Sequence, residues 1–209
     1  MAEPDKSPKM EPDPASDPVS GDLSALAAAA REAGGRGFPP VHLWNPPHCS
    51  DIGLRIARDG TWHYRNSPIG RIALVKLFAS VLRKDPEGHV LVTPVEKVSV
   101  EVEDAPFLGV ELEVDRTSGA PALVVRTNLD DIVRIGAEHP LRFEKAAADG
   151  LKPYIRVRGD LWALATRSVL LDLVELGETR FVDGVEMFGI LSQDVFFAMA
   201  PASDVGDMT

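Results

Sequence analysis

Two stretches of this chain, about 100 residues apart, show the same order of hydrophobic patterns, and this order restricts the fold more than any other feature. In the first stretch, apolar and polar side chains alternate over residues 54–58, which predicts a half-buried β-strand. Asp59 and Gly60 form a two-residue turn sequence of the kind that requires positive φ angles. Residues 61–64 return as a second strand, so the stretch begins with a β-hairpin.

A helix is predicted directly after this hairpin. Ser67 is suited to the N-cap and Pro68 to the first helical position, and apolar residues then recur at helical spacing as far as Leu82. We expect this helix to end near Arg83. Two strands follow, and they complete a ββαββ unit; they cover residues 89–93 and 98–102.

The second stretch repeats this order. It predicts two strands, a helix and two more strands, over residues 154–158, 161–164, 167–176, 186–191 and 195–199. Trp62 and Trp162 occupy the same place in the two hairpins. We interpret the agreement as an internal duplication, with chance similarity as the alternative. A duplication implies two similar lobes, with any shared site at their junction.

The chain is therefore expected to be an α+β protein of two lobes that share a repeated ββαββ motif, with mostly antiparallel sheets each packed on one helix. Five prolines in the first 21 residues predict a disordered acidic tail. We expect an N-terminal α+β domain, a C-terminal α+β domain and a flexible tail, over residues 22–103, 104–200 and 201–209.

The charge is unevenly distributed. The chain has 22 Lys and Arg against 32 Asp and Glu, a net charge of −10. Residues 22–159 hold 18 acidic and 18 basic residues, whereas residues 160–209 hold nine acidic residues and only Arg167 and Arg180. This balance argues against nucleic acid and anionic membranes as partners. A polar N-terminus without a long apolar run favours a cytoplasmic protein.

The sequence contains none of the familiar catalytic motifs, so no catalytic residue, metal site or cofactor is predicted. A zinc site would have to be built from irregularly spaced side chains, which the spacing does not favour; they are His42, His48, Cys49, Asp51 and His63. Cys49 as a nucleophile would need His48 or His63 as its base, and a small buried thiol is the preferred interpretation.

A small anionic ligand is the most specific binding hypothesis. Arg55 and Arg71 lie close to the first hairpin and the start of the helix, where backbone N–H groups also attract anions. The alternative is that these arginines pair with neighbouring carboxylates. The candidate ligand-binding residues are Trp44, Asn45, Cys49, Asp51, Arg55, Arg71 and Glu96.

Residues 43–71 and 91–98 resemble DUF1285, a bacterial family of domains of unknown function. Family members have Cys-Gly-Asp-Ile-Asp-Met where this chain has residues 49–54, so Gly53 replaces an acidic residue. The resemblance implies two domains that share a repeated αβ motif. It implies no established activity, although signal transduction has been suggested for the family.

These observations favour a non-catalytic regulatory or ligand-binding module, with a link to signal transduction implied by the resemblance. We expect a small anionic ligand or a protein partner, and self-association as a homodimer. The alternative is an enzyme of unrecognised class that uses Cys49, Asp51 and nearby arginines. A third hypothesis assigns partner binding to residues 1–21. Arginines held in ion pairs would favour the module, and an exposed Cys49 in a pocket would favour the enzyme.

Overall fold

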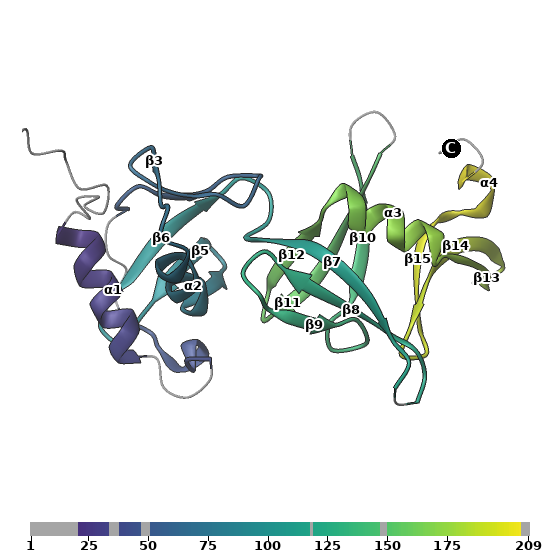
Figure 1. The fold of residues 1–209 in the computed structure, drawn as a ribbon, viewed down its shortest axis with the longest axis horizontal. Coiled ribbons are helices and arrows are strands. Elements are labelled where there is room, and N and C mark those ends of the chain that lie inside the picture. The colour runs from purple at the N-terminus through teal and green to yellow at the C-terminus, as the bar shows by residue number, and fades with distance from the viewer. Residues whose placement is uncertain (1–20, 34–37, 47–50, 118, 147–149, 206–209) are drawn as a thin grey trace, which may run out of the picture.

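The computed structural model describes most of the chain, and the predicted N-terminal tail and Cys49 lie outside the described residues. Described are residues 21–33, 38–46, 51–117, 119–146 and 150–205. Figure 1 shows two sheet-rich parts joined by the segment that leads into β7. We call residues 21–102 the N-terminal half, residues 103–106 the connector and residues 107–205 the C-terminal half.

The N-terminal half is a six-stranded sheet with two helices. Its elements are α1 (Gly21–Ala33), the 3-10 helix η1 (Val41–Leu43), β1 (Leu54–Ile56), β2 (Trp62–Tyr64), β3 (Ser67–Pro68), α2 (Ile72–Ser80), β4 (Leu82–Asp85), β5 (Gly88–Val92) and β6 (Lys97–Val102). The strand order is β3-β2-β1-β6-β5-β4. Trp62 stacks on Phe78 of α2, with ring centroids 6.4 Å apart, so the sheet and α2 share one core.

The helix α2 begins later than the sequence predicts. Ser67 and Pro68 form β3, because Arg65 and Asn66 have φ angles of 46° and 69° and turn the chain back onto β2. Arg71, in an extended conformation, occupies the N-cap. The helix also ends earlier, at Ser80; Val81 is its C-cap and Leu82 begins the strand β4.

The C-terminal half contains a second six-stranded sheet and a smaller sheet. Its elements are β7 (Phe107–Asp115), β8 (Ala122–Thr127), β9 (Ile132–Arg134), β10 (Leu141–Lys145), β11 (Leu151–Arg158), β12 (Leu161–Ala165), α3 (Arg167–Glu175), β13 (Glu178–Val182), β14 (Val185–Ser192), β15 (Val195–Pro201) and α4 (Ala202–Val205). The strand orders are β10-β11-β12-β7-β8-β9 and β13-β14-β15. Residues 202–205, predicted as part of a flexible tail, form α4.

The predicted fold class is confirmed: two sheet-rich halves, mostly antiparallel, each contain a helix. The repeated order of strands and helix is present with one additional strand after each helix, β4 and β13, and with β3 before α2 in the first stretch alone. The sheets show a different repeat. In each six-stranded sheet the first and last strands are parallel neighbours, with Leu54 opposite Val100 and Phe107 opposite Ala163. In space, β1–β6 therefore correspond to β7–β12, and β13–β15 are an addition.

The two halves meet through α2 and the turn between β8 and β9. Arg158 of β11 donates a 2.7 Å hydrogen bond to the carbonyl of Ala79, in the last turn of α2, and pairs with Asp131 at 3.0 Å. A cationic donor at the C-terminal end of a helix is favourable because the free carbonyls there are partially negative.

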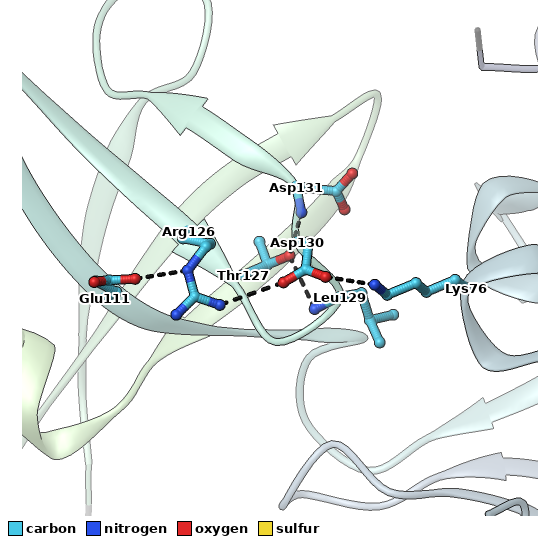
Figure 2. A network of polar contacts seen from close by, with 7 residues as sticks. All are labelled: Lys76, Glu111, Arg126, Thr127, Leu129, Asp130 and Asp131. Carbon is cyan, nitrogen blue, oxygen red and sulfur yellow. Dashed lines mark hydrogen bonds and ion pairs between the residues drawn. The ribbon is translucent and has the colours of Figure 1, made fainter. Parts of the chain in front are cut away.

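A second, more exposed network crosses the same boundary (Figure 2). Lys76 of α2 donates a hydrogen bond to Asp130, which lowers the pKa of that carboxyl. Asp130 also pairs with Arg126 at 3.3 Å, and Arg126 pairs with Glu111 at 2.6 Å. The hydroxyl of Thr127 accepts hydrogen bonds from two backbone N–H groups of the turn and so fixes its shape.

We predict that Gly60→Ala destabilises the protein more than Gly184→Ala. The two glycines have φ angles of 81° and 82°, so each substitution carries a similar backbone cost of roughly 1–2 kcal/mol. A Cβ at Gly60 would lie 2.8 Å from Nδ2 of Asn128 and 3.2 Å from Cδ1 of Leu108 in the other half, whereas nothing lies within 4 Å at Gly184.

Urea unfolding at neutral pH measures this difference. We expect an additional loss of roughly 1–3 kcal/mol for Gly60→Ala, because the site has no room for a methyl group. Equal losses for the two variants would contradict the close contact between the halves.

Candidate functional site

A cavity of about 600 Å³ lies where the two halves meet. Its walls come from three segments: the β4–β5 hairpin of the N-terminal half, the connector, and strands β10 to β12 of the C-terminal half. The cavity therefore lies at the junction of the two halves, where the interpretation as a duplication placed any shared site.

The connector contributes Asp104, whose side chain is only 8% exposed. Oδ1 of Asp104 accepts a 2.6 Å hydrogen bond from the hydroxyl of Tyr154, and Oδ2 accepts one from Nζ of Lys152. The guanidinium of Arg58, from the N-terminal half, lies 3.8 Å away. Burial alone would raise the pKa of Asp104, but these donors outweigh it and lower the pKa. Burial, followed by the hydrogen bond to Asp104, raises the pKa of Tyr154.

The C-terminal wall is an arginine stacked on aromatic rings. The guanidinium of Arg142 lies 4.1 Å from the ring centroid of Trp162 and 5.3 Å from that of Tyr154. Sheet register explains the arrangement, because Arg142 is directly opposite Tyr154, and Trp162 is a diagonal neighbour of Tyr154 on β12. Arg142 also pairs with Glu144 at 3.1 Å, with both side chains about half exposed.

The N-terminal wall comes from the β4–β5 hairpin. Asp85 accepts a 2.6 Å hydrogen bond from Arg83 and lies 3.1 Å from Nζ of Lys97; the hydrogen bond from Arg83 lowers the pKa of Asp85. His89 is partly buried, and burial together with the charge of Lys84 lowers its pKa to about 4. The imidazole is therefore neutral at physiological pH.

The described residues contain no group of three or more His, Cys, Asp or Glu side chains that could hold a metal ion. In the same part of the chain no helix is long and apolar enough to cross a membrane. The lining combines two cations, a neutral imidazole and several apolar side chains with three carboxylates, Asp85, Asp104 and Asp160. This arrangement suits binding of a small molecule.

The residues predicted from the sequence lie elsewhere in the N-terminal half. Trp44 packs against the core, and its carbonyl accepts a 2.7 Å hydrogen bond from Arg83. Asn45 is exposed. Asp51 is also exposed and accepts a 2.7 Å hydrogen bond from the backbone N–H of Gly53. Gly53 has a φ angle of 81°, in the left-handed region that glycine adopts without strain.

The two predicted arginines are not brought together around a pocket. Arg55 pairs with Glu103, and the other oxygen of Glu103 accepts a 3.0 Å hydrogen bond from the backbone of Arg58. Arg71 is exposed at the N-cap of α2, and Glu96 ends a tight turn that begins at Thr93. None of the six described candidates lines the cavity, and Cys49 lies outside the described residues.

Sequence comparison covers both halves. Residues 39–105 match the N-terminal domain, and residues 106–199 the C-terminal domain, of the domain of unknown function DUF1285. The chain belongs to the DUF1285 family. This chain is 41% identical in sequence to a DUF1285 family protein from Silicibacter pomeroyi DSS-3 that has a crystal structure. The TM-score between the two structures is 0.78, and the match covers 87% of this chain and 97% of that chain.

A DUF1285 family protein from Shewanella baltica OS155 also matches this DUF1285 chain. It is 28% identical and has a TM-score of 0.47, over 59% of this chain and 91% of that chain. No curated protein matches. The family assignment therefore agrees with the resemblance seen in the sequence and assigns no activity to the cavity.

We predict that Asp104→Asn destabilises this DUF1285 protein at neutral pH by roughly 1.5–3 kcal/mol, because Lys152 loses its anionic partner. The control is Asp160→Asn. The side chain of Asp160 is 75% exposed, so this substitution should reduce the free energy of unfolding by only roughly 0–1 kcal/mol.

The effect depends on pH in a defined direction. The folded-state pKa of Asp104 is below its ordinary value of 3.8, so the stabilisation is complete above that value and is lost as the pH falls through the folded-state pKa. Unfolding measured across this range should show the gap between wild type and Asp104→Asn closing in acid. A gap that persists unchanged in acid would show that the carboxylate charge is not responsible.

We also predict that His89 titrates near pH 4 in the folded protein, which NMR of the imidazole protons measures. Its ordinary pKa is 6.5, so the unfolded chain takes up this proton first and stability falls as the pH drops from 6.5 towards 4. His89→Gln should remove that part of the decrease. Titration of His89 near its ordinary value would contradict the burial of the ring.

Proposed function

We propose that this DUF1285 protein is a non-catalytic ligand-binding module whose site is the cavity between its two halves. The observation that carries the proposal is the composition of the walls: both halves and the connector contribute side chains to one cavity of about 600 Å³. That volume is within the range of small-molecule sites in proteins, which are mostly preformed and few in number.

Because both halves contribute walls to the cavity, ligand binding there can change the relative position of the two halves. A molecule that contacts both walls is bound most tightly in one relative position, so it shifts the population towards that position. This supports a regulatory role, including the link to signal transduction that the family resemblance implies. A protein partner and a homodimer stay predictions of the sequence.

The enzymatic alternative draws less support from the geometry. It relies on arginines near Asp51, and Arg55 is already paired with Glu103. Asp51 itself accepts a hydrogen bond from the backbone within a turn, away from the cavity. The geometry therefore favours the ligand-binding module over the enzyme.

We predict that a thermal-shift screen of cytoplasmic metabolites and nucleotides finds compounds that stabilise the full chain. A ligand that binds only the folded state at about 100 times its Kd adds about 2.7 kcal/mol of stability. For a protein of this size, that corresponds to an increase in Tm of roughly 5–10 °C.

The location of binding is tested with two matched variants. Trp162→Leu removes a ring from the cavity wall and should weaken binding, whereas Phe181→Leu removes a ring that is 76% exposed and lies outside the cavity. The proposal fails if no compound of any charge raises the Tm, or if Trp162→Leu binds every hit as tightly as Phe181→Leu does.

A further inference from the structure

The carboxylates that line the cavity are already compensated by cations. Asp85 is held by Arg83 and Lys97, and Asp104 by Lys152, with Arg58 close by. Asp160, which is mostly exposed, lies 3.6 Å from Arg156. Cations outnumber carboxylates among the described lining side chains and their ion-pair partners, by seven to four. The cations are Arg58, Arg83, Lys84, Lys97, Arg142, Lys152 and Arg156. The carboxylates are Asp85, Asp104, Glu144 and Asp160.

Two of these cations line the cavity itself, one on each side. Lys84 has no carboxylate within ion-pair distance in the described part of the chain, and its charge disfavours the protonated form of His89. Arg142 pairs only with Glu144 there, and because both side chains are about half exposed, water and salt weaken that pair. Both cations are thus available to an incoming anion.

The guanidinium of Arg142 also has a donor geometry that suits anions. It lies over the Trp162 ring, 4.1 Å from the ring centroid, and its planar set of N–H groups matches a carboxylate or phosphate group. The apolar part of the lining consists of Pro86, Ala105, Pro106 and the ring of Trp162. A ligand that matches both kinds of surface has an anionic head and an apolar body.

We infer that the cavity binds a small organic anion, with its carboxylate or phosphate head between Lys84 and Arg142 and its apolar body against Pro86, Ala105, Pro106 and Trp162. The head contacts one cation from each half and therefore holds the halves together. This inference rests on the proposed function and adds the chemical class of the ligand.

A series of naphthalene compounds that differ only in the head group tests the charge preference. The probes are naphthalene-2-carboxylate, 2-naphthyl phosphate, naphthalene-2-carboxamide and naphthalene-2-methylammonium, with inorganic phosphate as the head alone. We expect calorimetric titration of the full chain to show both organic anions binding at least roughly tenfold more tightly than the carboxamide. The ranking of carboxylate against phosphate identifies the head group.

Three charge variants test the two cations. Lys84→Gln and Arg142→Gln should each weaken binding of the anions by roughly tenfold and leave binding of the carboxamide almost unchanged. Arg116→Gln removes an exposed cation on the β7–β8 loop, outside the cavity, and should change neither. All three residues are exposed, so the fold should be retained, which circular dichroism checks.

The outcomes separate this inference from the proposed function. The anion assignment is overturned if the carboxamide or the ammonium compound binds as tightly as the anions, if Lys84→Gln and Arg142→Gln behave like Arg116→Gln, or if no probe binds. The proposed function would still stand in those cases if the metabolite screen yields a neutral or cationic ligand that Trp162→Leu weakens.

Discussion

The ion pair between Asp104 and Lys152 determines where the connector lies, and the cavity depends on that position. The side chain of Asp104 is mostly buried, and both of its oxygens are bound by side chains of β11. A buried carboxylate is tolerated only when its hydrogen-bonding capacity is filled, so the connector is held against β11 rather than left free in solvent. Ala105 and Pro106 follow directly and line the cavity.

The other contacts between the halves differ in how much they contribute to stability. The pair between Lys76 and Asp130 joins side chains that are 42% and 58% exposed, so water and salt screen it and it adds little to stability. Arg158 is less exposed and binds both a helix carbonyl and Asp131. Gly60 marks a close approach of the two halves, because a Cβ there would lie 2.8 Å from Nδ2 of Asn128. Packing and Arg158 therefore fix the relative position of the halves more than the exposed network does.

Local sequence patterns predicted much of the fold and little of the cavity. Alternation and the Asp59-Gly60 turn predicted the first hairpin correctly, but the start of α2 was misplaced because the turn at Arg65 and Asn66 carries no glycine signal. The strands β4 and β13 were missed: β4 contains one apolar residue, Leu82, followed by three charged residues, and β13 is mostly exposed. The cavity joins Arg142, Tyr154 and Trp162 through sheet register, which composition and spacing do not reveal. The predicted internal duplication was the one sequence observation that placed a shared site at the junction of two lobes.

The parallel pairing at the centre of each six-stranded sheet has a consequence for how the chain acquires its structure during synthesis. β1 pairs with β6, and β7 with β12, so the two partners in each pair are the most distant strands of their sheet in sequence. Each sheet has an unpaired central edge until its last strand is made, and such long-range pairing is slow because the loop must close first. The N-terminal sheet is complete once Val102 has been added. It can therefore fold before β7 exists, which leaves only one open central edge exposed to aggregation at a time.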